Sequence, residues 1–290
     1  MLFAEDEYEK RKFLIDVPEG VRIPSLGDET QLSVELYGWP MGVSGAITWR
    51  GVWAALPLIL QRAEFLQGAK VLELGAGCGL LANTAAVLGA SCMFCLGHGQ
   101  RSQKPLKTSW TCTGAHSTAT DGNEEEIPLL QKNAFSFADG LMLGGSLSAT
   151  HLEWGQHAAE RSGLPSKGFD LIVGSEIVYI PDCIPALVES LCFFLADDGE
   201  AIIANTAVAT RTDQSAAREL LCECLEAKGL TFNMDMPPRS PPPPDEDNWA
   251  ETSYILYIKK MLKIIYYYYS FWEYINYYID NMIYCVLVSL

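Results

Sequence analysis

A glycine-rich turn between two apolar segments restricts how this chain can fold more than any other feature of its sequence. The segment VLELGAGCGLL at 71–81 runs from an apolar stretch into Gly75, Ala76 and Gly77, and a second apolar stretch follows. Residues without bulky side chains let a ligand approach the backbone closely, and the N-terminus of a following helix presents free N–H groups. The segment therefore predicts a buried strand, a ligand-binding turn and a helix, which together open an α/β unit.

Strand-like and helix-like segments alternate along the rest of the chain. This alternation predicts a mainly parallel sheet with helices on both faces. The predicted strands are 31–39, 69–77, 116–121, 169–179, 199–208 and 253–260. The predicted helices are 49–66, 79–90, 124–134, 184–196 and 214–229.

Four segments lie outside this alternation. Residues 1–45 form an N-terminal extension in which we expect a β-hairpin. A stretch at 92–116 is inserted between the first helix of the α/β unit and the next strand. A proline-rich loop occupies 237–248, and an aromatic low-complexity tail fills 261–290.

The insertion carries four side chains of a kind that bind metals. Cys92, Cys95, Cys112 and His116 have a spacing compatible with a tetrahedral zinc site. No other signature supports such a site, so we predict no metal. The insertion is otherwise interpreted as a surface loop, or as a segment that the normal gene product lacks.

The charge of the chain limits its partners. Asp and Glu total 36 against 20 Lys and Arg, which gives a formal net charge of −16. Such a chain repels phosphate, so we expect no nucleic-acid partner. The absence of an apolar signal segment and the irregular cysteine spacing favour a cytoplasmic, or else nuclear, monomer. Glu273 and Asp280 interrupt the aromatic tail, so we do not expect a membrane anchor.

The spacing of the glycines separates two kinds of nucleotide site. Dinucleotide-binding turns follow G-x-G-x-x-G, which would require glycine where this chain has Leu80. The observed Gly75, Gly77 and Gly79 resemble S-adenosylmethionine methyltransferases instead. Asp121 ends the next predicted strand, where an adenosine-binding α/β site places a carboxylate for the ribose hydroxyls. An aspartate that caps a turn would also suit the Asp-Gly sequence.

Five segments that occur in order make the resemblance more specific. They are GVWAALPLIL, VLELGAGCGL, ATDGNEEEIPLLQKN, HLEWG and FDLIVGSEIVY. Together they resemble the seven-β-strand methyltransferases of methyltransferase family 16, the methyltransferase-like protein-lysine methyltransferases. The resemblance implies a methyltransferase domain at 46–260 with a Rossmann-like class I fold. In that fold a mostly parallel, twisted sheet of seven strands has helices on both faces.

The resemblance also implies a cofactor and a set of site residues. The cofactor would be S-adenosyl-L-methionine. Its binding residues would be Trp53, Gly75, Ala76, Gly77, Asp121, Trp154 and Ser175. Asp121 would hold the ribose, Trp154 would pack near the adenine and Trp53 would close the pocket, although a tryptophan on an amphipathic helix commonly belongs to the core. Glu176 and Tyr179 match the acid-x-x-Tyr motif of the family and are the expected catalytic residues.

Methyl transfer to an amine fits these residues. A lysine has a free pKa of about 10.4, so it must lose a proton before it accepts a methyl group. Proximity and alignment would supply most of the rate. Glu176 would orient the ammonium group and Tyr179 would form an aromatic wall. In the structural alternative, Glu176 caps or orients backbone and Tyr179 packs in the core.

We therefore expect an S-adenosylmethionine-dependent methyltransferase that acts on a lysine side chain of a protein substrate. A methyltransferase on histidine or on a small molecule would share the cofactor half of the site. A non-catalytic protein of the same fold is a further alternative, because the insertion at 92–116 could displace Asp121.

Overall fold

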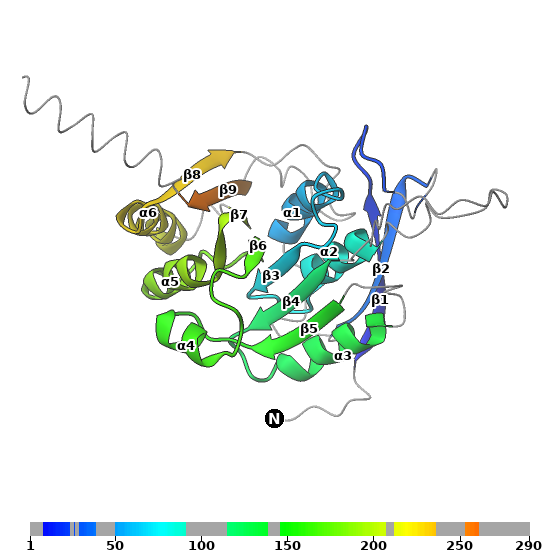
Figure 1. Ribbon diagram of the computed structural model, residues 1–290, viewed down its shortest axis with the longest axis horizontal. Coiled ribbons are helices and arrows are strands. Elements are labelled where there is room, and N and C mark those ends of the chain that lie inside the picture. Colours follow the sequence, from blue (N-terminus) through cyan, green and yellow to red (C-terminus); the bar gives the residue numbers. More distant parts are fainter. Residues whose placement is uncertain are drawn as a thin grey trace, which may run out of the picture.

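The computed structural model describes residues 8–23, 26, 29–38, 50–90, 115–138, 146–206, 212–235 and 253–260. Its centre is a sheet of seven strands with helices on both faces, which confirms the predicted fold (Figure 1). The strands of the described part are β1 (Glu9–Asp16), β2 (Gln31–Gly38), β3 (Lys70–Leu74), β4 (His116–Asp121), β5 (Ser146–His151), β6 (Phe169–Ser175), β7 (Leu195–Thr206), β8 (Leu230–Asp235) and β9 (Ser253–Lys260). The helices are α1 (Arg50–Leu60), α2 (Leu80–Ala90), α3 (Ile127–Ala138), α4 (Gln156–Arg161), the 3₁₀ turn η5 (Pro181–Cys183), α5 (Ile184–Phe194) and α6 (Thr212–Ala227).

The strand order places a ligand site at the carboxyl ends of the parallel strands, which we call the carboxyl edge of the sheet. The order is β5-β4-β3-β6-β7-β9-β8, with β5 to β7 parallel and β9 antiparallel between β7 and β8. Leu74 pairs with Thr120 on one side and with Gly174 on the other, so β3, β4 and β6 end at the same edge. Ligands of open parallel sheets bind at this carboxyl edge, where the strand order reverses. Here the order reverses between β3 and β6.

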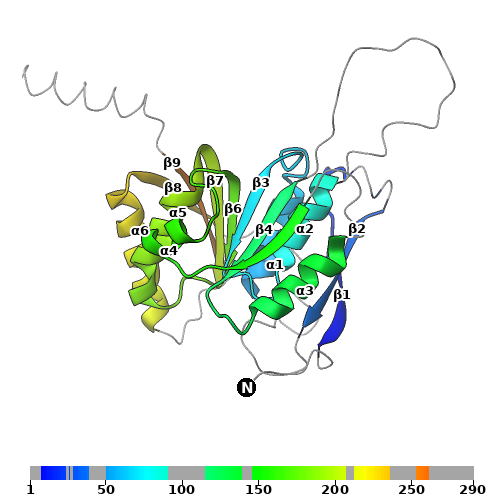
Figure 2. The same ribbon diagram turned by 60° about the horizontal axis from the view of Figure 1, so that its bottom comes forward.

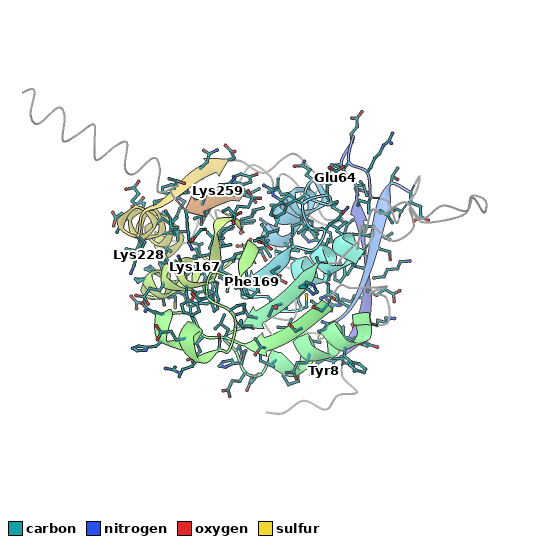
Figure 3. All side chains as sticks on the ribbon, viewed as in Figure 1. Tyr8, Glu64, Lys167, Phe169, Lys228 and Lys259 are labelled. Atoms are coloured by element: carbon teal, nitrogen blue, oxygen red, sulfur yellow. The ribbon has the colours of Figure 1, made fainter. Side chains whose placement is uncertain are left out.

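The side chains of the central strands alternate between two cores. Val71 packs in the cluster that contains α1 and α2, whereas Leu72 packs in the cluster that contains α4, α5 and α6. Figure 2 shows the two groups of helices on opposite faces of the sheet. Phe169, labelled near the centre of Figure 3, packs edge-on against Phe194 with ring centroids 5.9 Å apart. Burial of one large apolar side chain contributes about 1.5–3 kcal/mol, so the two cores hold β3 firmly below the glycine turn.

A separate two-stranded antiparallel sheet, β1 with β2, covers part of the α1 and α2 side. Exposed and buried residues alternate along β2, and its buried Leu32, Val34 and Leu36 join the core. The carboxamide of Asn133 on α3 ties the end of β2 to the main fold. Its Oδ1 accepts from the Tyr37 N–H at 2.7 Å, and its Nδ2 donates to the Tyr37 carbonyl at 3.0 Å.

Several element boundaries differ from those predicted, among them the end of α1, the start of α3 and the end of β6. α1 ends at Leu60 and not at 66, because the chain tightens there into bonds such as the one from Arg62 N to the Ile59 carbonyl. α3 begins at Ile127, after a turn at 124–126. β6 ends at Ser175 and not at 179, because the next residue adopts a left-handed backbone.

Three elements were not predicted from the sequence. β5 and β8 are the two edge strands of the sheet, and both are only partly buried. Their sequences, SLSATH and LTFNMD, therefore lack the apolar run that marks the central strands. α4 is a single short helix of 6 residues.

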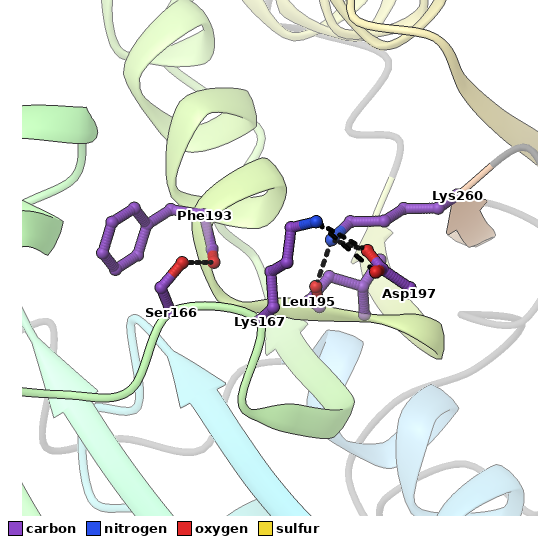
Figure 4. Close-up of polar contacts among 6 residues, drawn as sticks. All are labelled: Ser166, Lys167, Phe193, Leu195, Asp197 and Lys260. Atoms are coloured by element: carbon purple, nitrogen blue, oxygen red, sulfur yellow. Dashed lines mark hydrogen bonds and ion pairs between the residues drawn. The ribbon is translucent and has the colours of Figure 1, made fainter. Parts of the chain in front are cut away.

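A cluster of charged side chains makes ion pairs at the end of the strands opposite the carboxyl edge (Figure 4). The Nζ atoms of Lys167 and Lys260 lie 3.0 and 3.3 Å from Oδ1 of Asp197, and Lys260 also donates to the Leu195 carbonyl. These contacts join the end of β9 to the junction between α5 and β7.

Several segments named in the sequence lie outside the described residues. These are the proline-rich loop at 237–248, the tail at 261–290 and all of the 92–116 insertion except its last two residues. His116, the last of these, begins β4. Among the described helices, none is both long enough and apolar enough to cross a membrane.

Candidate active site

The glycine turn has a backbone that only glycine adopts easily. Gly75, Gly77 and Gly79 have φ angles of 62°, 54° and 80°, in the left-handed region. A Cβ atom added to Gly75 would lie 2.6 Å from Cγ2 of Ile177, so the turn also lacks space for a side chain there. Glycine is therefore required by the backbone of the turn and, at Gly75, also by the packing of Ile177.

Asp121 lies directly against this turn. Its Oδ2 accepts a hydrogen bond from the Gly77 N–H at 3.0 Å, and its Oδ1 accepts one from the Asn123 N–H at 2.9 Å. The Ala76 N–H donates to the Thr120 carbonyl at 2.8 Å. These bonds keep the end of β4 next to the turn, so Asp121 is not displaced from it.

The buried carboxyl group of Glu73, on β3, is hydrogen-bonded to the start of α2, the helix that follows the glycine turn. Its side chain is 1% exposed, and its Oε2 accepts from the Ala82 N–H at the start of α2 at 2.8 Å. Burial raises the pKa of Glu73 to about 8, although the backbone donors of α2 act in the opposite direction. Burial likewise raises the pKa of the Cys78 thiol to about 12, so this cysteine of the turn stays protonated.

Trp154 also lies beside Gly75. Its Cζ2 is 3.6 Å from the position of a Cβ atom on Gly75. The loop that carries it is anchored on both sides, because Leu152 N donates to the Asp121 carbonyl at 2.8 Å and Gly155 N donates to Ser190 Oγ at 2.9 Å. Trp154, Asp121 and the glycine turn are therefore brought together.

The end of β6 supplies the remaining wall of the site. Ser175 ends the strand and pairs with Ala204 of β7. Tyr179 is 45% exposed at this edge, and its pKa is raised first by partial burial and then by Cys183 and Asp121.

Two of the predicted site residues, Trp53 and Glu176, make contacts that do not involve the glycine turn. The ring of Trp53 packs against Phe13 of β1, with centroids 6.1 Å apart. The carboxylate of Glu176 accepts from the backbone N–H groups of Gly51 and Thr206. These contacts join neither side chain to the glycine turn.

Sequence reasoning missed three residues that shape the site. Ile177 fills the space beside Gly75, and Asn205 exchanges two bonds of 3.1 Å with the backbone of Val178. His151 ends the unpredicted β5, with Nε2 3.1 Å from the Gly122 carbonyl. The position of Ile177 inside the acid-x-x-Tyr motif was the one signal available in the sequence.

The arrangement fits an adenosyl cofactor. The left-handed glycines leave the backbone of the turn without side chains at three positions, and a carboxylate stands at the end of the adjacent strand. Gly75, Ala76 and Gly77 would line the cofactor, and Asp121 would bind its ribose. With the strand order above, these features define the fold of the S-adenosylmethionine-dependent methyltransferases.

The comparison with known families is more specific. A family model described as lysine methyltransferase, methyltransferase family 16, matches residues 39–221, more than half of the chain. The chain belongs to this family, which confirms the resemblance drawn from the sequence.

Two curated relatives agree with this assignment. Protein N-lysine methyltransferase METTL21A of Danio rerio is 26% identical over 144 residues, which cover 48% of this chain and 52% of the relative. Protein-lysine N-methyltransferase EFM3 of Chaetomium thermophilum is 29% identical over 154 residues, which cover 52% of this chain and 38% of the relative. The matches thus span about half of the first relative and less of the second.

A solved structure has a weaker likeness. The S-adenosylmethionine-dependent methyltransferase of Aquifex aeolicus superposes with a TM-score of 0.47 at 12% identity, and the match covers 70% of this chain and 88% of that one. The strand order of this chain, and not that likeness, defines its fold.

Proposed function

We propose that this protein transfers a methyl group from S-adenosylmethionine to a lysine side chain of a protein substrate. The contact between Asp121 and the Gly77 N–H carries this proposal, because it brings together the two elements that we expect to bind the cofactor. Membership of the lysine methyltransferase family, and two relatives named as lysine methyltransferases, support lysine as the acceptor.

The chemistry requires alignment more than acid or base strength. S-adenosylmethionine supplies an electrophilic methyl group on a sulfonium, which leaves as a neutral thioether. Tyr179 is 45% exposed shortly after the end of β6 and would form the wall along which the lysine enters. Trp154 would pack against the adenine, beside Gly75. Positioning of this kind contributes several kcal/mol to a displacement reaction, up to about 7–11.

The charges around the site favour a lysine in a basic segment. The loops at 121–126, 152–155 and 176–180, all at the carboxyl edge, contain Asp and Glu but neither Lys nor Arg. Glu124, Glu125 and Glu153 among them are exposed. Complementary charge would raise the rate of encounter with a basic substrate.

The test is transfer of a tritiated methyl group from S-adenosylmethionine into a whole-cell protein extract, with Asp121→Ala as the control enzyme. After acid hydrolysis we expect the label in Nε-methyllysine, with little or none in the control reaction. Label in methylhistidine, or in the fraction below protein size, would favour those acceptors. A folded enzyme that binds S-adenosylhomocysteine but labels nothing would contradict the proposal.

A further inference from the structure

The acid of the acid-x-x-Tyr motif is bound on its carboxylate by backbone donors. Oε1 of Glu176 accepts from the Gly51 N–H at 2.8 Å and from the Thr206 N–H at 3.1 Å, and Oε2 lies 3.2 Å from the same Thr206 nitrogen. Gly51 belongs to the first turn of α1, whose N–H groups have no partner within the helix. Thr206 ends β7. The carboxylate therefore joins the start of α1 to the end of β7.

The space around this junction is filled. A Cβ atom added to Gly51 would lie 2.6 Å from the Ala204 carbonyl oxygen and 3.0 Å from Oε1 of Glu176. The backbone N–H of Glu176 itself donates to the Ala204 carbonyl at 2.9 Å. A lysine ammonium of a substrate would thus compete for a carboxylate that is already enclosed and hydrogen-bonded.

The same junction sets the path of the motif. Glu176 has a φ of 55°, a left-handed conformation that costs a residue with a side chain about 1–2 kcal/mol. The turn directs Ile177 against Gly75 and leaves Tyr179 exposed at the edge of the sheet. Between them, both backbone groups of Val178 are held by Asn205.

We infer that Glu176 is a positioning residue and does not orient the target ammonium. Its carboxylate holds the start of α1, and its backbone turn places Ile177 beside Gly75 and leaves Tyr179 exposed after the end of β6. This inference rests on the proposed function for its effect on methyl transfer. The contacts of the carboxylate are independent of that function.

Substitutions at Glu176 can separate the positioning role of its carboxylate from a role in orienting the substrate ammonium. In Glu176→Gln the carbonyl oxygen can still accept from the Gly51 and Thr206 N–H groups, but the negative charge is lost. In Glu176→Ala both the acceptor oxygen and the negative charge are lost. Gly51→Ala keeps the charge but crowds both the Ala204 carbonyl oxygen and the Glu176 carboxylate, and so disturbs the junction itself. Asp170→Ala is the matched control, because Asp170 makes a similar bond, 2.7 Å from the Lys70 N–H, at the opposite edge of the sheet.

The experiment measures the methyl-transfer rate of the full chain and, without substrate, the hydrogen-exchange protection of the Gly51, Thr206 and Val178 amides. We expect Glu176→Gln to transfer within about threefold of wild type and to keep the protection. We expect Glu176→Ala to lose about 100-fold in rate and Gly51→Ala at least about tenfold. The protection should fall in Glu176→Ala, and Asp170→Ala should match wild type in rate.

One contrary result is a Glu176→Gln variant that keeps the amide protection but loses as much methyl-transfer rate as Glu176→Ala. That result would overturn the inference and assign the negative charge a role toward the substrate. Unchanged protection in Glu176→Ala would also overturn it. An inactive wild type would instead count against the proposed function, while the exchange data would still decide the role of the carboxylate.

Discussion

At the scale of single residues, Gly75 is the position where backbone conformation and packing coincide. Both its φ of 62° and the nearby Ile177 side chain exclude a larger residue. Gly163 offers a matched position, because its φ is 75° and nothing lies within 4 Å of an added Cβ atom.

We expect Gly163→Ala to lower the free energy of unfolding by about 1–2 kcal/mol through backbone strain alone. Gly75→Ala should lose about 1–3 kcal/mol more through the clash with Ile177, and its affinity for S-adenosylhomocysteine should fall by at least about tenfold. Urea denaturation and calorimetric titration would measure these effects. Equal losses in the two variants would show that the space beside Gly75 is unimportant.

The sequence predicted the residues of the site unevenly, for a physical reason. Gly75, Gly77 and Asp121 lie within four residues of strand ends, and the ends of neighbouring parallel strands meet whatever the details of packing. The direction of a carboxylate depends instead on the backbone of its own residue. The left-handed φ of Glu176, which turns its side chain toward α1, has no signal in the sequence.

At the scale of secondary-structure elements, Glu73 couples the junction of β3 and α2 to pH. Its pKa is about 8 in the folded chain because of burial, against about 4.3 when unfolded. Between these values the folded state binds the proton and the unfolded state does not. The free energy of unfolding should therefore fall as pH rises through this range.

Glu73→Gln removes this ionisation and keeps an acceptor for the Ala82 N–H. We expect the stability of the variant, relative to wild type, to increase from pH 5 to about pH 8 and then level off. Urea denaturation at a series of pH values would measure the difference, in which the other ionisable groups largely cancel. A difference that is constant or that decreases over this range would contradict the assignment.

The side chain of Asn133 joins the two-stranded sheet to the glycine turn by hydrogen bonds. Besides its two bonds to Tyr37, its Nδ2 donates to the Cys78 carbonyl at 2.9 Å. Asn133→Ala leaves these buried groups unpaired, so we expect a loss of about 1–3 kcal/mol in stability. The affinity for S-adenosylhomocysteine should fall as well. The exposed Asn233 serves as the control, and Asn233→Ala should change neither quantity; similar results for both variants would argue against the coupling.

The elements that the sequence did predict are those with buried sides. β6 and β9 are central and read as apolar runs, whereas the edge strands β5 and β8 have one neighbour each and tolerate polar residues. The parallel direction of the central strands followed from the alternation of strands and helices and could be expected without any detail of packing.

At the scale of the whole molecule, charged residues lie at both ends of the parallel strands. Lys167 and Lys260, at the edge opposite the site, are paired with Asp197, and Lys259 is paired with Glu200. The carboxyl edge carries the exposed acidic loops around the site. Under the proposed function, these exposed acids would attract a basic substrate segment.

We expect the KM for a basic lysine peptide to rise severalfold between about 50 and 300 mM NaCl, because salt screens the attraction between exposed charges. A peptide with the same lysine in a neutral sequence should show little change, and kcat should be nearly constant for both. A KM for the basic peptide that does not respond to salt would exclude the acidic loops from substrate binding.

The central claim is that the glycine turn and Asp121 form one cofactor site, and calorimetric titration of the full chain with S-adenosylhomocysteine tests it most directly. We predict binding of one molecule in the micromolar range or tighter, weakened about 10- to 100-fold in Asp121→Ala. The neighbouring Glu124→Ala should bind like wild type, because Glu124 is exposed away from the Gly77 contact. A folded wild type that binds nothing, or an Asp121→Ala variant that binds as tightly as wild type, would contradict the account.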